Sequence, residues 1–157
     1  MNFITDIFEQ FNKKWALVAA GDKDNHNAMT ISWGSMGTLW SKPIVTVYVK
    51  PCRYTYEYMN NNDYFTVSFY DEKYREALNI MGSRSGRDCK KEILANLHVK
   101  QLEHGVTYEE AEVTIVCKKI YYQDLDISQI PAEQIERHYR SEEPHRVFVG
   151  EVIDIIK

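Results

Sequence analysis

Arg53 and Thr55 could bind an anion together, because they stand at the start of a predicted helix. The β-branched segment 44–49 predicts a strand, and residues 55–62 predict a short helix after it. The free N–H groups and the dipole at a helix start favour an anion. A guanidinium and a hydroxyl would add charge-assisted hydrogen bonds, and Lys50 could supply a second cation. The alternative is a solvated arginine followed by an ordinary helix cap.

The segment 27–33 predicts a strand with polar side chains where a core strand would carry aliphatic ones. Asn27, Thr30 and Ser32 offer hydrogen bonds, and Trp33 ends the segment. The sequence SWGSMG reads as a Gly/Ser loop, whose glycines would let the backbone approach a flat ring closely. The alternative is a half-exposed strand with alternating faces, in which Trp33 belongs to the core. A site for a flat polar ring beside a site for a phosphate would suit a nucleotide-like cofactor.

A third polar segment, residues 83–91, carries several cations in a chain of net charge −4. These cations are Arg84, Arg87, Lys90 and Lys91. A charged run is often only a solvated face, and that remains the alternative here. Arg84 and Arg87 could also attract the phosphates of a pyridine nucleotide.

The composition of the 157 residues is that of a single globular domain, with 44% apolar and 27% charged residues. The acidic balance argues against a nucleic-acid binder, and no apolar run approaches the ~20 residues that cross a bilayer. The N-terminus has acids where a signal peptide needs basic residues, so we expect a cytoplasmic protein. The three cysteines are widely separated and lack metal-type spacing, which predicts reduced thiols and no metal site.

The hydrophobic pattern predicts mainly strands, interrupted by short helices. We expect strands over residues 15–20, 27–33, 44–49, 64–70, 112–122 and 146–156. We expect helices over residues 3–13, 55–62, 72–81 and 89–97, with Asp71 and Asp88 as caps and Gly82 as a stop. Because strands and helices do not alternate strictly, an antiparallel barrel with peripheral helices fits better than a parallel doubly wound fold.

Several short motifs, in their order and spacing, resemble the flavin reductase-like, FMN-binding split-barrel family, especially its flavoredoxin-type branch. They run from about residue 15 to residue 153. The motifs are Asn27-Ala28-Met29-Thr30-Ile31-Ser32-Trp33, Ser41-Lys42-Pro43, Arg53-Tyr54-Thr55, Ser85-Gly86-Arg87-Asp88 with Lys91, and His145 with Gly150-Glu151-Val152.

The resemblance implies one domain over residues 1–157, a mainly β, antiparallel split β-barrel with short peripheral helices. It also implies a homodimer that binds FMN between its protomers. His145 would face the flavin ring as the catalytic residue, and Lys91 would reach the N1–C2=O edge of the ring. The residues implied to contact FMN are Asn27, Ala28, Met29, Thr30, Ser32, Trp33, Lys50, Arg53, Thr55, Ser85, Gly86, Arg87 and Lys91.

The activity implied by the resemblance is that of an NAD(P)H:flavin reductase, which passes a hydride from nicotinamide to flavin N5. No GxGxxG fingerprint is present, so the nicotinamide nucleotide would bind transiently over the flavin. The alternatives are a flavoredoxin-type electron carrier and a non-catalytic FMN-binding protein. The chain ends soon after the His145 strand, without the aromatic C-terminal segment of many relatives. We expect the insert 123–144 to supply that cover through Tyr139, Arg137 or Arg140.

Overall fold

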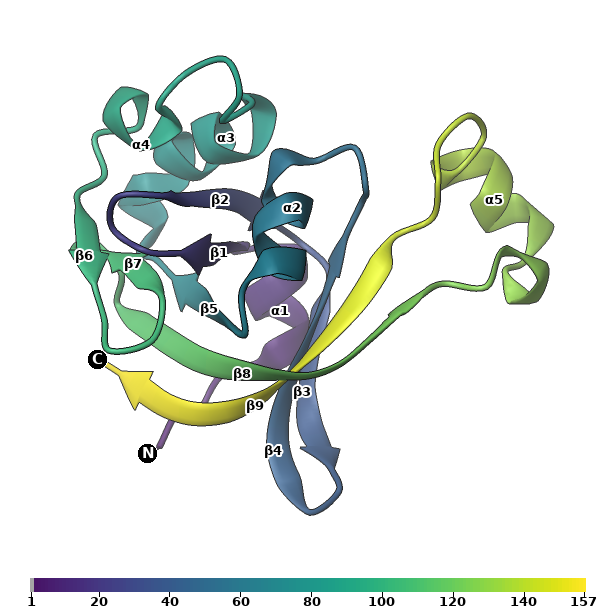
Figure 1. The fold of residues 1–157 in the computed structure, drawn as a ribbon, viewed down its shortest axis with the longest axis horizontal. Coiled ribbons are helices and arrows are strands. Elements are labelled where there is room, and N and C mark those ends of the chain that lie inside the picture. The colour runs from purple at the N-terminus through teal and green to yellow at the C-terminus, as the bar shows by residue number, and fades with distance from the viewer. Residues whose placement is uncertain (1) are drawn as a thin grey trace.

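One seven-stranded antiparallel sheet organises the protein in the computed structural model, which describes residues 2–157 (Figure 1). The strands follow the order β2-β1-β5-β8-β9-β4-β3, and a separate two-stranded sheet pairs β6 with β7. The strands of the large sheet are β1 (Ala16–Gly21), β2 (His26–Ile31), β3 (Gly34–Leu39), β4 (Lys42–Val49), β5 (Tyr64–Phe69), β8 (Val113–Asp124) and β9 (Arg146–Ile156). The small sheet contains β6 (Val99–Gln101) and β7 (Val106–Tyr108).

Short helices surround the sheet. They are α1 (Ile7–Asn12), α2 (Tyr54–Asn61), the 3₁₀ helix η1 (Glu72–Tyr74), α3 (Arg75–Ser83), α4 (Lys91–Leu94), the 3₁₀ helix η2 (Ile127–Gln129) and α5 (Ala132–His138). Asp6 caps α1 by accepting from the backbone N–H groups of Phe8 and Glu9, and Asp71 caps η1 by accepting from that of Lys73. No helix within residues 2–157 has the length and apolar character needed to cross a membrane.

Strand β1 explains how two apolar cores fit in so short a chain. Its residues alternate between the cores: Val18 packs with Val45 and Phe65, whereas Leu17 packs with Leu78 under α3. Both faces of β1 are therefore buried, which accounts for its nearly continuous apolar sequence.

Gly150 on β9 is required by close packing of the first core. A Cβ atom there would stand 2.6 Å from both the Cβ of Cys117 and the ring of Phe65. The glycine lets β8 and β9 approach β5 across the core.

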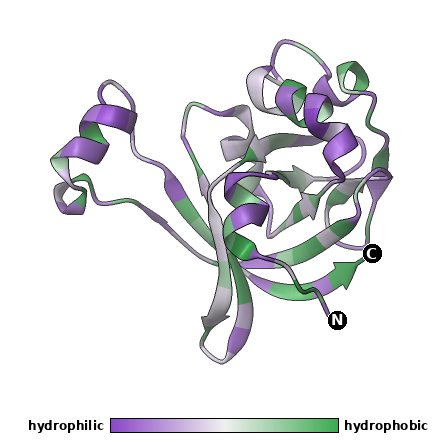
Figure 2. Ribbon diagram, turned by 180° about the vertical axis from the view of Figure 1, so that it is seen from behind, coloured by the Kyte–Doolittle hydropathy of each residue, from purple (hydrophilic) through white to green (hydrophobic). Residues whose placement is uncertain are grey.

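The long strands β8 and β9 extend beyond the sheet as a two-stranded stalk that carries the insert 123–144. Figure 1 shows α5 standing apart from the body of the domain at the end of this stalk. Figure 2 shows that α5 is mainly hydrophilic.

Four sequence-based expectations were wrong. The segment SWGSMG is not only a loop, because Gly34–Leu39 pairs with β4 along its whole length as β3. Gly82 does not stop a helix, because α3 continues to Ser83. Asp88 caps no helix, since the backbone turns between Ser85 and Cys89 and α4 begins only at Lys91. Residues 99–101 and 106–108, which carried no strand prediction, form β6 and β7.

Candidate functional site

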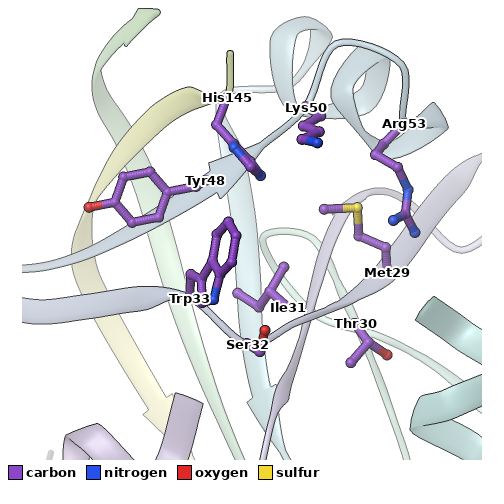
Figure 3. A pocket seen from close by; sticks show the side chains of 9 residues that line it. All are labelled: Met29, Thr30, Ile31, Ser32, Trp33, Tyr48, Lys50, Arg53 and His145. Carbon is purple, nitrogen blue, oxygen red and sulfur yellow. The ribbon is translucent and has the colours of Figure 1, made fainter. Parts of the chain in front are cut away.

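A first cavity of about 250 Å³ opens between β2 and the end of β4. Figure 3 shows the side chains around it, with the ring of His145 and the indole of Trp33 pointing toward one another. Both rings are aromatic and lie 5.3 Å apart between centroids. The lining residues are Met29, Thr30, Ile31, Ser32, Trp33, Tyr48, Lys50, Arg53 and His145.

Strand β2 supplies one wall of this cavity because its outer edge has no neighbouring strand. It lies at the edge of the sheet and pairs only with β1. The hydroxyl of Thr30 donates to the carbonyl of Leu78 on α3, so that hydroxyl is already engaged. The hydroxyl of Ser32 makes no hydrogen bond to another residue in the described chain, and Trp33 is 43% exposed. The hydroxyl of Thr30 on β2 is therefore engaged, whereas that of Ser32, which directly follows β2, is free to meet a ligand.

His145 is buried and uncharged at neutral pH. Burial, together with the nearby charge of Lys50, lowers the pKa of its imidazole to about 4. Its Nδ1 lies 2.6 Å from the hydroxyl of Tyr139, which follows α5. The imidazole can therefore act in the cavity as a neutral hydrogen-bonding group.

Lys50 fastens the insert to the edge of the same cavity. Its ammonium donates to the carbonyl of His138 at 3.0 Å and pairs with Glu142. That ion pair lowers the pKa of the Glu142 carboxyl. The predicted role of Lys50 beside a phosphate does not fit this arrangement. Its ammonium is paired with Glu142 of the insert, and it does not line the cavity described next.

A second cavity of about 270 Å³ adjoins the first, and Arg53 lines both. It lies between the start of α2, the end of α3 and the loop before α4. Its lining residues are Asn27, Cys52, Arg53, Tyr54, Thr55, Gly82, Ser83, Arg84, Ser85, Gly86 and Lys91.

Three cations, Arg53, Arg84 and Lys91, line this second cavity without a carboxylate. Arg53 donates to the carbonyl of Gly82 at 2.9 Å, and Lys91 donates to the carbonyl of Met81 at 2.9 Å. Within residues 2–157, neither Arg53 nor Lys91 forms a salt bridge. Lys91 is only 2% exposed, and burial together with the charge of Arg53 lowers the pKa of its ammonium to about 8. The charge in this cavity therefore favours the binding of an anion.

Thr55 is held in a fixed position beside the same cavity. It is the second residue of α2 and is 1% exposed, and its hydroxyl oxygen accepts from the amide of Asn27 at 2.7 Å. The hydroxyl proton of Thr55 is thus left to donate into the second cavity. The alternative of an ordinary cap at Thr55 does not hold, since Arg53 occupies the N-cap position.

Gly86 allows the loop before α4 to approach this pair. A Cβ atom at Gly86 would stand 2.1 Å from the side-chain oxygen of Asn27 and 3.0 Å from the ring of Tyr54. Any larger residue would displace the amide that orients Thr55.

Most residues predicted to bind the cofactor line one of the two cavities, but two line neither. Ala28 faces the second apolar core, packed beneath α3. Arg87 pairs with Glu57 at 2.8 Å and lies over the ring of Tyr54, outside the cavity lining. Lys91 lies with Arg53 and Thr55 in the second cavity, where its ammonium donates to the carbonyl of Met81. Its predicted reach to the N1–C2=O edge of the flavin stays a prediction.

Sequence reasoning missed other lining residues, notably Tyr48 in the first cavity and Ser83 in the second. Tyr48 alternates with the buried Val47 and Val49 on β4, and this period-two pattern was the available signal. Arg137 and Arg140 line neither cavity, and Arg140 pairs with Glu136 on its own helix. No group of three or more potential metal ligands occurs in the part of the chain that the structure describes.

Solved structures with the same fold support this description of the domain. Flavoredoxin from Methanosarcina acetivorans has a TM-score of 0.72 at 22% identity, over 92% of this chain and 68% of that one. Flavoredoxin from Desulfovibrio vulgaris (Miyazaki F) has a TM-score of 0.70 at 22% identity, over 90% and 68%. A flavin reductase with a split barrel domain from Shewanella frigidimarina, described as putative, has a TM-score of 0.69 at 18% identity, over 91% and 66%. The predicted split-barrel fold is thereby confirmed.

The family assignment rests on sequence as well as fold. No curated protein sequence matches the chain. The family model of the flavin reductase like domain, however, matches residues 8–156, which is nearly the whole chain. The protein therefore belongs to the flavin reductase-like domain family.

Proposed function

We propose that the protein is an FMN-binding oxidoreductase, most simply an NAD(P)H:flavin reductase. The observation that carries the proposal is the pair of adjoining cavities that share Arg53, one lined by aromatic rings and the other by unpaired cations. Ligand pockets in proteins usually measure roughly 300–1,000 Å³, a range that the two joined cavities reach together.

The residues present fit the chemistry of FMN. Its phosphate carries a charge near −2 at neutral pH, and Arg53, Lys91 and the hydroxyl of Thr55 offer donors of the matching kind. The buried ammonium of Lys91 is costly without an anion, which favours a phosphate in the second cavity. Ser32, Trp33 and the neutral imidazole of His145 suit a flat ring with a polar edge in the first cavity.

When bound, FMN supplies the capacity to accept two electrons as a hydride, and the protein supplies position and electrostatics. Arg53 and Lys91 hold the phosphate end of the molecule. His145 offers an uncharged hydrogen-bonding group that does not change protonation around neutral pH. Trp33 keeps part of its ring exposed, so the first cavity is open to a nicotinamide that arrives from solvent.

A flavoredoxin-type electron carrier is the second candidate. It is favoured by the two flavoredoxins among the solved structures of the same fold, whereas another neighbour is a nitrilotriacetate monooxygenase component B from Bacillus cereus. A non-catalytic FMN-binding protein is the third. Fold similarity alone does not choose among these activities.

An anaerobic absorbance titration tests the three candidates together. We expect the purified protein to take up about one FMN per chain and its yellow colour to bleach on addition of NADH or NADPH. Bound flavin that either nucleotide leaves oxidised, but that dithionite reduces, would point to the electron carrier. A protein that binds no FMN would refute the proposal.

We also propose a homodimer. Large apolar side chains are exposed beside the first cavity, among them Phe8, which is 84% exposed. A groove of about 590 Å³ lined by Phe8, Phe11, Trp33 and Met36 adjoins the same cavity through Trp33 and Tyr48. Burying this surface against a second copy would remove it from water. Light scattering should give twice the chain mass, and a monomer that still binds FMN tightly would contradict this proposal.

A further inference from the structure

Tyr139 brings the insert into contact with the first cavity. Its hydroxyl lies 2.6 Å from Nδ1 of His145, and the two rings meet edge to face with centroids 5.5 Å apart. The only side-chain hydrogen bond of His145 within the described residues is the one at Nδ1, and no buried side-chain nitrogen or oxygen there lacks a partner, so the opposite nitrogen, Nε2, is open to solvent. The His145 ring points into the cavity (Figure 3). One nitrogen is therefore bound to the insert while the other faces the ligand space.

The end of α5 is held firmly enough to fix this contact. Lys50 donates to the carbonyl of His138, next to Tyr139 in the chain, and its ammonium lies 5.5 Å from the centre of the Tyr139 ring. The His138 ring packs edge to face against Trp33 at 5.1 Å. Contacts from β4 and from the end of β2 thus hold the tyrosine in place.

The direction of the hydrogen bond decides what His145 offers to a ligand. A neutral imidazole carries one N–H, and the hydrogen bond made by one nitrogen determines which nitrogen holds the proton. If the phenol donates to Nδ1, the proton must be on Nε2, directed into the cavity. If Nδ1–H donates to the phenol oxygen, Nε2 can only accept.

We propose that Tyr139 is a positioning residue that donates to Nδ1 and holds His145 as the Nε2–H tautomer, a hydrogen-bond donor toward the first cavity. The matching ligand group is a hydrogen-bond acceptor on a planar ring or carboxamide, either a carbonyl oxygen or an unprotonated nitrogen. That ligand assignment rests on the proposed function, whereas the tautomer does not.

The groups that face His145 are compatible with this role. Lys50, which directly follows β4, and His138 from α5 disfavour a second proton on the ring, whereas Glu142 from the loop after α5 favours one. Trp33 contributes only an uncharged ring. The balance keeps the imidazole neutral, which the assignment of a single tautomer requires.

Nitrogen NMR of the imidazole side chains, recorded on the protein without ligand at pH 7, tests the tautomer. His145→Gln identifies the signal by its loss. We expect a protonated Nε2 and an unprotonated, hydrogen-bonded Nδ1 in the wild-type protein. A proton on Nδ1 would overturn the proposal, and this wild-type measurement does not depend on any variant folding.

Tyr139→Phe removes only the hydroxyl. We expect the Nδ1 resonance to move to that of a nitrogen without a donor, and the pKa of His145 to rise by roughly one pH unit, because the neutral ring loses a hydrogen bond of ~1 kcal/mol. Tyr121→Phe is the matched control, since that tyrosine is on the same insert stalk but donates to Gln123. An unchanged Nδ1 resonance and pKa in Tyr139→Phe would refute the positioning role.

Kinetics separate this proposal from the proposed function. In Tyr139→Phe we expect FMN affinity within twofold of the wild type and reduction by the nicotinamide nucleotide slowed about tenfold, as for loss of one oriented donor. An equal loss of FMN affinity and rate would instead indicate a purely structural role. If the wild-type protein is not reduced by either nucleotide, the proposed function fails while the NMR result on the tautomer still stands.

Discussion

Lys91 offers the sharpest test of where a phosphate binds, because its charge is buried without a counter-ion. The ammonium is 2% exposed, is hydrogen-bonded to the carbonyl of Met81, and shares the second cavity with Arg53. We expect Lys91→Met to weaken FMN binding. A hydrogen bond to a charged group contributes ~1.5–3 kcal/mol, which corresponds to a loss of about 10- to 150-fold in affinity.

The pH dependence of binding follows from the same lysine. Its pKa is lowered to about 8 in the ligand-free protein, and a bound phosphate would raise it again. The protonated form binds the anion, so affinity should be level below pH 7 and fall above pH 8. At pH 9 about one lysine in eleven is protonated, so the affinity should be about tenfold below its plateau. Lys91→Met should remove this dependence.

Lys91 should lower the stability of the ligand-free protein, although it strengthens the binding of an anion. A lysine pKa that is lower in the folded than in the unfolded protein means that the unfolded state binds more protons, so the lysine destabilises the fold below its ordinary pKa of 10.5. The shift from 10.5 to about 8 corresponds to at most about 3 kcal/mol. Lys91→Met should therefore raise the free energy of unfolding at pH 7 by up to that amount.

Isothermal titration calorimetry with FMN and riboflavin, and urea unfolding of the ligand-free protein, measure these effects. Lys90→Met is the matched control, because Lys90 is exposed and lines neither cavity. Riboflavin lacks the phosphate, so its affinity should be the same in both variants and in the wild type. If Lys91→Met weakens riboflavin and FMN equally, the lysine contacts the ring and the placement of the phosphate in the second cavity is wrong.

Three further predictions concern other parts of the structure. Gly86→Ala should weaken FMN binding at least tenfold with little loss of fold, since its Cβ would displace the Asn27 amide; calorimetry and circular dichroism measure the two effects, and unchanged affinity would contradict the assigned role of the loop. Gly150→Ala should lower the free energy of unfolding by ~1–3 kcal/mol through overpacking against Cys117 and Phe65, whereas Gly37→Ala, which has no atom within 4 Å, should cost much less in the same urea titration. The rate of flavin reduction should show no histidine inflection between about pH 5.5 and 8, because the pKa of His145 is about 4; a stopped-flow inflection near 6.5 that His145→Gln abolishes would refute this.

Local sequence signals were sufficient to place Arg53 and Thr55 together at the start of α2, but they did not reveal the other residues of the same cavity. The order of strand, Arg53, Thr55 and helix is read within a few residues, and the structure brings Arg53 and Thr55 to one cavity. The position of Lys91 depends on where α3 ends and on the turn between Ser85 and Cys89, which tertiary packing sets. A short helix such as α4 is only marginally stable on its own, so its start could not be read from propensity.

Long-range pairing explains the strands that the sequence did not reveal. The segment Gly34–Leu39 contains two glycines and is disfavoured as a strand by propensity, yet it pairs with β4 through six residue pairs. The strands β6 and β7 are three residues each and pair with each other, and β7 also contacts β1 and β5. In contrast, β1, β5 and β9 were predicted well, because burial gives them long apolar or alternating patterns.

The places where this chain departs from the rules of a stable fold coincide with the two cavities. A lysine is buried beside an arginine without an acid, a histidine turns one ring nitrogen toward the first cavity, and polar residues line the open edge of β2. The buried lysine costs stability in the free protein, and a ligand with a flat polar ring and a phosphate would meet all of these groups at once. They are spread over β2, α2, the loop before α4 and the start of β9, so no single motif could have shown the site. The joint occurrence of these uncompensated groups is therefore a stronger argument for a phosphorylated flavin than any one residue.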